Sequence, residues 1–353
     1  MVSVSLLAGC SLAYATQQPL ERVKVTPWLI NYVLPSYEHL HQANLTLQES
    51  TAGLCASETL NIKAIQNAQP ALINALNAMA YSQGIDGGPM QGQLRNFRIY
   101  FWPDRKNLVE KQLSKLLKEP DYGLLEPMGL THASVALTGY PVIERLLFDP
   151  YFQHQLINDK EGFTCQYLNA VTQNISHISQ QVVYAWQNDW RLQLAHPKTT
   201  NTYIKTDQHQ VNFIFTNVDV LLAKIISKKL TKPLTSSAKT AKPKRMESWR
   251  SQQSINMLKT NMTALTDILT LVLKPSLQQS NNMKYWLEIE QKLSFIQFQL
   301  NQLPSPLTQY LNTPKVWDQV SVIKMHTQML QAQLQQLHPA LGVQLGFNAY
   351  DGD

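Results

Sequence analysis

The feature that most constrains the fold is a regular recurrence of apolar residues, at alternating steps of three and four, through the C-terminal half of the chain. This spacing lines one face of an α-helix, and it occurs in four successive segments. They run from Val211 to Ile225, Ile255 to Val272, Trp286 to Leu303 and Val316 to Leu337. Proline-containing breaks separate them, at Pro233 with Pro243, at Pro275, and at Pro304 with Pro306 and Pro314. Four such segments predict a four-helix bundle.

The N-terminal half repeats this pattern less regularly. Clear stripes begin at Ile30, Ile65 and Leu168, and further helices are expected over 108–117 and, with an interruption, over 130–148. We therefore predict an all-α fold of two bundles of the four-helix type, which a diverged duplication would produce. The predicted division is a signal segment over 1–18, an N-terminal bundle with loop insertions over 19–200, and a C-terminal bundle over 201–353.

The composition supports a folded helical chain. Charged residues make up 15% of the sequence, against about 25% in typical domains, but hydrophobic residues reach an ordinary 44%. Only 13 of the 353 residues are glycine. This number disfavours a turn-dense all-β fold and a phosphate-binding glycine loop.

The basic character of the chain is concentrated in one stretch. Nine of its cations lie between Lys224 and Arg250, together with a single anion, Glu247, so this stretch has a net charge of +8 and the rest of the chain −2. A basic run without interleaved aromatic residues is more typical of a solvated linker than of a nucleic-acid groove. We predict a basic linker near 228–246 and no nucleic-acid partner.

The N-terminus predicts export. A short apolar run over residues 2–8 ends in Leu7-Ala8-Gly9-Cys10, which resembles the lipobox of bacterial lipoproteins, with Cys10 as the lipidated residue. The basic residues expected ahead of such a run are missing, and a frayed apolar terminus is the alternative. No segment reaches the roughly 20 apolar residues of a membrane-spanning helix. We therefore expect a periplasmic or outer-membrane-attached lipoprotein that meets the membrane only through its lipid anchor.

Export would leave one even pair of cysteines, Cys55 and Cys165, in an oxidising compartment. Cys55 precedes the second expected helix and Cys165 the last helix of the N-terminal bundle. In an up-down-up-down bundle these two helix starts lie at the same end. This arrangement allows a disulfide, and two free thiols are the alternative.

The expected helix over 130–148 contains an unusual interruption. Inside a helix, Gly139 would cost about 1 kcal/mol relative to alanine, and Pro141 about 3 kcal/mol. Glu144 and Arg145 follow among apolar neighbours that predict burial. A buried carboxylate needs a partner, and an ion pair within or between helices is the simplest one.

At this point the residues resemble a known family. The run Gly139-Tyr140-Pro141-Val142-Ile143-Glu144 is similar to the G-x-H-x-x-E signature of imelysin-like proteins, bacterial periplasmic or surface proteins that are linked to iron uptake and named after a metallopeptidase. Other similar segments follow the family's order: Arg98 to Pro103, Cys165 to Trp186, Glu247-Ser248-Trp249-Arg250-Ser251 with Ser254, and Leu345 to Asp353. The resemblance implies a two-bundle fold with a pocket where the bundles meet.

The chain departs from the family signature at its histidine. Histidine and glutamate three residues apart share a helix face and can bind one metal, but Pro141 stands at the histidine position and offers no side-chain donor. One carboxylate alone is a weak metal site. The family suggests a metal ion, whereas these residues lead us to expect no cofactor and no catalytic residue.

Within the resemblance, we expect seven residues to line the ligand pocket: Trp102, Tyr140, Glu144, Glu247, Arg250, Ser251 and Ser254. Arg250 beside two hydroxyls is typical of an anion or carboxylate receptor. The alternative is a helix start, in which Ser248 is the N-cap and Arg250 lies on the surface.

Two functions from different classes remain. The first is a non-enzymatic periplasmic lipoprotein whose degenerate site binds a small ligand or a component of iron uptake. The second is a metal-dependent peptidase or metal-binding protein that uses Glu144 and unrecognised ligands. The proline at position 141 favours the first, and metal analysis of the purified protein would distinguish them.

Overall fold

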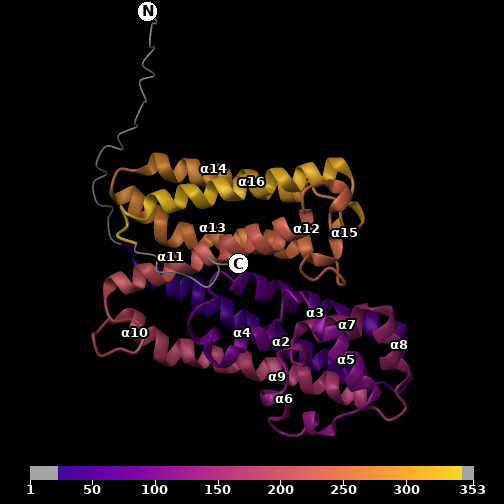
Figure 1. The fold of residues 1–353 in the computed structure, drawn as a ribbon. Coiled ribbons are helices and arrows are strands. Elements are labelled where there is room, and N and C mark those ends of the chain that lie inside the picture. The colour runs from indigo at the N-terminus through magenta and orange to yellow at the C-terminus, as the bar shows by residue number, and fades with distance from the viewer. Residues whose placement is uncertain (1–22, 344–353) are drawn as a thin grey trace, which may run out of the picture.

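A computed structural model describes residues 23–343 of the chain, and every regular element in that range is helical, as predicted. Two bundles of helices lie one against the other (Figure 1). The long helices of the N-terminal bundle are α2 (Leu34–Cys55), α3 (Ile62–Ser82) and α9 (Phe163–Ala185). Those of the C-terminal bundle are α11 (Asp207–Lys224), α13 (Ser254–Gln279), α14 (Met283–Asn301) and α16 (Pro314–Leu337).

Short helices fill the connections. They are α1 (Val25–Trp28), α4 (Arg95–Ile99), α5 (Leu108–Lys118), α6 (Gly129–His132), α7 (Tyr140–Phe148), α8 (Pro150–Asn158), α10 (Arg191–Ala195), α12 (Lys232–Leu234) and α15 (Leu307–Tyr310). Three π-helical segments join longer helices end to end: Leu29–Val33, Trp186–Trp190 and Ile225–Thr231. The helix predicted over 108–117 is α5.

The apolar stripes predicted in the N-terminal half form its core, with one exception. On α3, the apolar residues that recur at steps of three and four from Ile65 to Met79 are all buried, and so are those from Leu168 to Val182 on α9. Ile30, however, is 53% exposed. It lies in the π-helical segment Leu29–Val33, where one extra residue per turn shifts the buried face to its neighbours.

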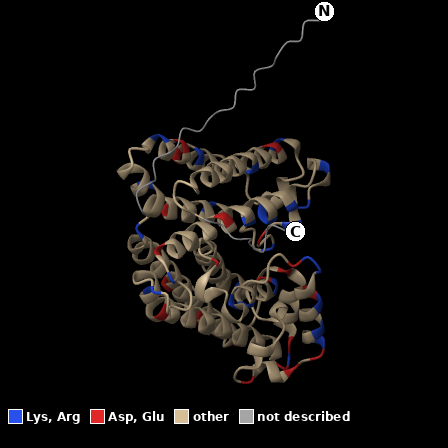
Figure 2. Cartoon of the chain, turned by 60° about the vertical axis from the view of Figure 1, so that its left-hand side comes forward, with Lys and Arg blue, Asp and Glu red and all other residues tan. Residues whose placement is uncertain are grey.

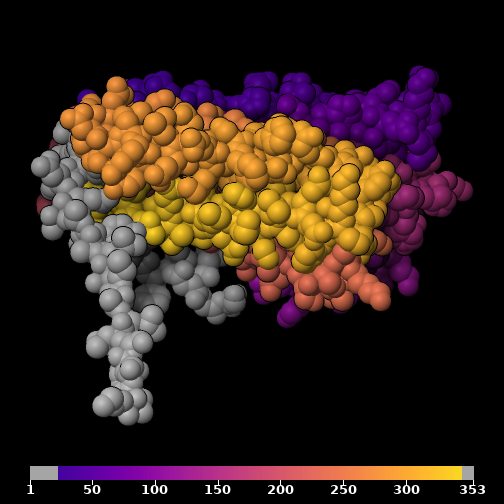
Figure 3. Space-filling view, turned by 90° about the horizontal axis from the view of Figure 1, so that it is seen from above, coloured from indigo at the N-terminus to yellow at the C-terminus, as the bar shows by residue number. Residues whose placement is uncertain are grey.

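The four stripes of the C-terminal half are buried on α11, α13, α14 and α16 as predicted. Seen from above, α14 and α16 run side by side as the outer layer of the molecule (Figure 3). One predicted break is wrong, because Pro275 lies inside α13, which continues to Gln279. Buried side chains on both sides of this proline, including Leu273 and Leu277, outweigh the lost backbone hydrogen bond.

The two bundles share one hydrophobic core. Helix α3 packs against α13, and buried residues from both halves of the chain form a single continuous cluster. The predicted boundary near residue 200 falls in the connection between α10 and α11. Residues placed on this shared surface are enclosed from both sides.

The expected basic linker near 228–246 is partly wrong. Its first residues continue α11 as the π-helical segment Ile225–Thr231, and Lys228 and Lys229 are buried. Its exposed cations are Lys232 and those of its later part, over 239–245, which lie between short turns. Elsewhere in the described range charged residues are thinly spread, with both signs interleaved (Figure 2).

Among the described residues, one helix is long and apolar enough to cross a membrane by length and composition. It is the continuous helix Asp207–Leu234, and 56% of its most apolar window is buried inside the protein. Its apolar side chains are therefore those of a core helix.

Cys55 and Cys165 are joined by a disulfide with a Cα–Cα distance of 5.6 Å. Cys55 is the last residue of α2 and does not directly precede α3, and Cys165 lies in the first turn of α9. The bond thus ties the end of one helix to the start of another that packs along it. Cys10 with its lipobox, and the run from Leu345 to Asp353, lie outside the described residues.

Candidate functional site

The segment that resembles the family signature begins a helix and does not interrupt one. Gly139 is the N-cap of α7, and Pro141 lies in its first turn, where no backbone donor is needed. The expected long helix from Leu130 is therefore wrong, because α6 and a 3-10 turn over Val135–Leu137 precede α7. A Cβ atom at Gly139 would lie 2.2 Å from the carbonyl oxygen of Ile99, so only glycine fits this contact.

Glu144 on α7 is 5% exposed, and its hydrogen-bond partner is Ser251 of the 247–254 segment. Its Oε1 atom accepts hydrogen bonds from the Ser251 backbone N–H at 2.9 Å and from the Ser251 hydroxyl at 2.6 Å. Burial raises the pKa of Glu144, while the Ser251 hydrogen bonds and the charges of Arg250 and Arg145 oppose that rise. The carboxylate therefore fixes the approach of the 247–254 segment to the N-terminal bundle.

The 247–254 segment is a tight turn ahead of α13. Ser248 has a φ of 44°, and its hydroxyl is 2.8 Å from that of Tyr100. The Ser254 hydroxyl donates to the Glu247 carbonyl oxygen at 2.7 Å. Ser248 is not a helix N-cap, because α13 begins six residues later and Gln253 precedes its first residue. Ser248 and Ser254 instead stabilise the turn of the 247–254 segment through their hydrogen bonds.

Glu247 pairs with a buried lysine from the C-terminal bundle. The Lys229 Nζ atom is 2.5 Å from Glu247 Oε2 and donates to Gln83 Oε1 at 3.0 Å and to Asn261 Oδ1 at 2.5 Å. Asn261 in turn donates to the Ala80 carbonyl oxygen near the end of α3. Burial lowers the pKa of Lys229 to about 8, against the attraction of Glu247. We call Lys229, Glu247, Gln83 and Asn261 the lysine network; it joins both bundles.

Arg250 lies at the edge of this region and pairs with other acids than Glu144. Its guanidinium group is 3.3 Å from both Glu110 and Asp149, and it stacks on the Trp249 ring at 4.3 Å. Its side chain is 11% exposed. It influences Glu144 through its charge and not through a hydrogen bond.

Arg145 is the second cation beside Glu144. It donates to the Pro141 carbonyl oxygen and to Asn107, and its guanidinium group is 4.0 Å from Asp104. Burial lowers its pKa to about 10, and the charge of Arg250 adds to that effect. Arg145 and Arg250 therefore also form ion pairs with carboxylates on α5 and in the loop that precedes it.

The structure brings four of the seven predicted pocket residues into this buried region: Glu144, Glu247, Ser251 and Ser254. Arg250 lies beside them. Tyr140 is fully buried below, where its hydroxyl donates to Asn44, and Trp102 is half-buried in the connection between α4 and α5. These carboxylates and hydroxyls bond to protein groups and are closed to solvent.

The sequence interpretation missed Lys229 and Tyr100. Lys229 continues the stripe of Val218, Leu221 and Ile225 by a further step of four, and this position indicates burial. Tyr100 lies within the quoted segment from Arg98 to Pro103, but its sequence gives no sign of its contact with Ser248.

The residues present do not fit the transition-metal site of the family signature. Pro141 has no donor atom, and Glu144 Oε1 already accepts two hydrogen bonds. Within residues 23–343, no group of three or more His, Cys, Asp or Glu side chains is arranged to hold a metal ion. A catalytic zinc normally has three protein ligands, which this site does not supply.

Comparison with known proteins gives a family and a fold. The family model described as Imelysin, Peptidase M75, matches residues 33–337. An imelysin-like protein from Psychrobacter arcticum 273-4 is similar in structure, with a TM-score of 0.76 and 17% identity over 93% of this chain and 100% of that one. A protein from Parabacteroides distasonis ATCC 8503, described as an iron-regulated protein A precursor, gives a TM-score of 0.67 and 11% identity over 89% and 98%. No curated protein matches by sequence.

Proposed function

Because the chain belongs to the imelysin family, we propose that it is a non-enzymatic binding protein of iron acquisition that acts outside the cytoplasm. The observation that carries this proposal is the state of Glu144. Its carboxylate is enclosed and bonded to Ser251, and the neighbouring signature position is Pro141. Such a carboxylate stabilises the join between two bundles, whereas a peptidase needs an open metal position for its water.

Two observations support a role outside the cytoplasm. The Cys55–Cys165 disulfide suits an oxidising compartment. One structural neighbour is described as an iron-regulated precursor. With the lipobox-like run ending at Cys10, these features favour a lipoprotein of the periplasm or outer membrane. The binding partner would be an iron-uptake component or a small ligand.

Metal analysis tests the loss of the metal site. We expect no stoichiometric zinc or iron in protein purified without chelators, and no metal-dependent peptide cleavage. Pro141→His supplies a ring nitrogen three residues before Glu144, so this variant should bind zinc more tightly in calorimetric titration. One tightly held metal per chain in the wild type, lost in Glu144→Gln, would support the metallopeptidase alternative and overturn the proposal.

Cellular experiments test location and role. Expression in a lipoprotein-competent bacterium should give a membrane-bound product that Cys10→Ser releases. Deletion of the gene should slow growth under iron limitation and leave iron-replete growth unchanged, and the Glu144→Gln copy, if stable, should restore growth. Equal growth of the deletion strain and its parent in both media would contradict a role in iron acquisition.

A further inference from the structure

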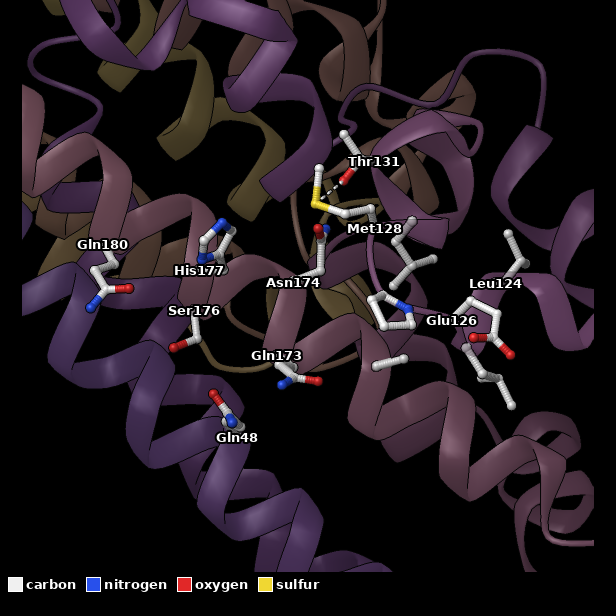
Figure 4. Close-up of a pocket in the computed structure, with 14 residues that line it drawn as sticks. Gln48, Leu124, Glu126, Met128, Thr131, Gln173, Asn174, Ser176, His177 and Gln180 are labelled. Carbon is white, nitrogen blue, oxygen red and sulfur yellow. Dashed lines mark hydrogen bonds between the residues drawn. The ribbon is translucent and has the colours of Figure 1, made fainter.

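A concave site lies on the N-terminal bundle, away from the buried Glu144 region. It is a cavity of about 520 Å³ between α2, α9 and the segment over 124–131. Figure 4 shows its labelled side chains, with Gln48 on α2 facing residues of α9 and Met128 on the opposite side. Ligand sites are concave surfaces of this size, in which a few polar groups converge against apolar walls.

One wall of the cavity is rich in amide groups. Gln173, Asn174 and Gln180 line it from α9, and Gln48 lines it from α2. Asn174 donates to the Thr138 carbonyl oxygen, but the side-chain amides of Gln48, Gln173 and Gln180 have no hydrogen-bond partner within residues 23–343. Each amide offers both donors and an acceptor, so these three can bind a ligand without breaking a bond in the protein.

The opposite wall is apolar and held in a strained conformation. It consists of Leu124, Leu125, Pro127, Met128 and Leu130. Met128 has a φ of 69°, a region that non-glycine residues rarely adopt, and its side chain is 64% exposed. The next residue, Gly129, packs so closely on Gly123 that a Cβ atom would lie 2.3 Å from the Gly123 oxygen. Tight packing therefore presents a flexible thioether to the cavity, and strain of this kind concentrates at ligand-binding segments.

The charges of the cavity restrict its ligand. Its lining contains one carboxylate, Glu126, one histidine, His177, and neither lysine nor arginine. An anionic ligand would find no fixed cation, and a divalent cation would find a single carboxylate. Amides are matched by groups that also both donate and accept hydrogen bonds, and the apolar wall is matched by an aliphatic side chain.

We propose that this cavity binds an extended, uncharged peptide segment of a partner protein. The amides of Gln48, Gln173 and Gln180 pair with its backbone N–H and C=O groups, and an apolar side chain of the peptide packs on Met128 and Leu130. The proposal shares no residue with the Glu144 region, so either one can fail alone.

A phage-displayed library of random peptides, selected on the full purified chain, tests it. We expect enrichment of uncharged sequences with aliphatic residues. A synthetic enriched peptide, followed by fluorescence polarisation, should bind about tenfold or more weakly to Gln173→Ala/Gln180→Ala, because two neutral hydrogen bonds are lost. Gln166→Ala is the matched control, since this exposed glutamine lies on α9 outside the cavity.

Met128→Gly separates binding from folding. Glycine adopts the left-handed conformation without strain, so this variant should melt no lower than the wild type and yet bind the peptide more weakly. The proposal is overturned if no enriched peptide is sensitive to the glutamine substitutions, or if acidic peptides dominate the selection. A glycan array in which a saccharide binds and the same variants abolish its binding would also overturn it.

Discussion

Replacing Lys229 with methionine tests the lysine network that joins the bundles. Methionine keeps the apolar stem but removes the ammonium group, which leaves Glu247, 2% exposed, without its cation and Asn261 Oδ1 without its donor. Breaking a buried ion pair by removing one partner costs about 3–5 kcal/mol. We expect a loss of that size in the free energy of unfolding. Lys232→Met, an exposed position in α12, should change it by less than about 0.5 kcal/mol.

The pH dependence gives this loss a distinct signature. Burial lowers the pKa of Lys229 in the folded protein to about 8, below the unfolded value of about 10.4. Between these two values the unfolded chain binds more protons than the folded protein, so the contribution of Lys229 to stability rises with pH in this window. Lys229→Met removes this rise, and its deficit relative to the wild type should be constant below about pH 7 and grow between about pH 8 and pH 10.

Urea denaturation followed by tryptophan fluorescence measures these free energies. Lys229→Met, Glu247→Gln and the double variant form a cycle, and we expect the double variant to be more stable than the sum of the single losses predicts, by about 1–3 kcal/mol. Additive losses would show that the 2.5 Å contact contributes no coupling. A single loss below about 1 kcal/mol, or one that does not change with pH, would refute the account of the network as a buried ion pair.

Three further predictions concern the fold. Burial alone would raise the pKa of Asp159, but hydrogen bonds from Thr164, Glu161 and Gly162 outweigh burial and lower that pKa. The stability that these bonds contribute should be full above about pH 4 and be lost as the pH falls through the folded-state pKa. Asp159→Asn should remove this acid dependence from denaturation curves. Cys55→Ser/Cys165→Ser opens a loop with a sequence separation of 110 and should lower the unfolding free energy by about 2–4 kcal/mol; a denaturation midpoint equal to that of the oxidised wild type would contradict this. Gly139→Ala drives a Cβ into the Ile99 carbonyl and should cost about 1–3 kcal/mol or more, with Gly53→Ala, where nothing lies within 4 Å, as the matched calorimetric control.

The long helices were predictable because their signal is local. The stripes on α3, α9, α13, α14 and α16 need only the period of one helix and a core to face, and burial follows that period residue by residue. The same logic misassigned Pro275, whose neighbours are held in α13 by contacts with other helices. A local rule cannot weigh packing that comes from distant parts of the chain.

The candidate site was predictable in part. The signature and the E-x-W-R-S run identified Glu144, Glu247 and Ser251, which the structure places in one buried region. These sequence runs did not reveal that Glu144 bonds to Ser251 while Glu247 bonds to Lys229. These pairings depend on how two bundles dock, and a one-dimensional pattern holds no information on that geometry. The cavity beside Met128 is not marked by a sequence motif. Its amide side chains come from two helices that are distant in the sequence, and the strained backbone at Met128 arises from how one turn packs.

The π-helical segment Ile225–Thr231 has a consequence for how such a chain changes over generations. An added residue within a helix advances everything beyond it by about 100° of rotation. A one-residue deletion here, such as loss of Ser227, would leave Lys229 and Glu247 in the sequence and yet turn Lys229 away from Glu247. Insertions and deletions in this turn therefore act like mutations of the distant 247–254 segment. We therefore expect relatives that differ in length in this segment to differ also in the residue at position 247, even where the residues between this segment and position 247 are the same.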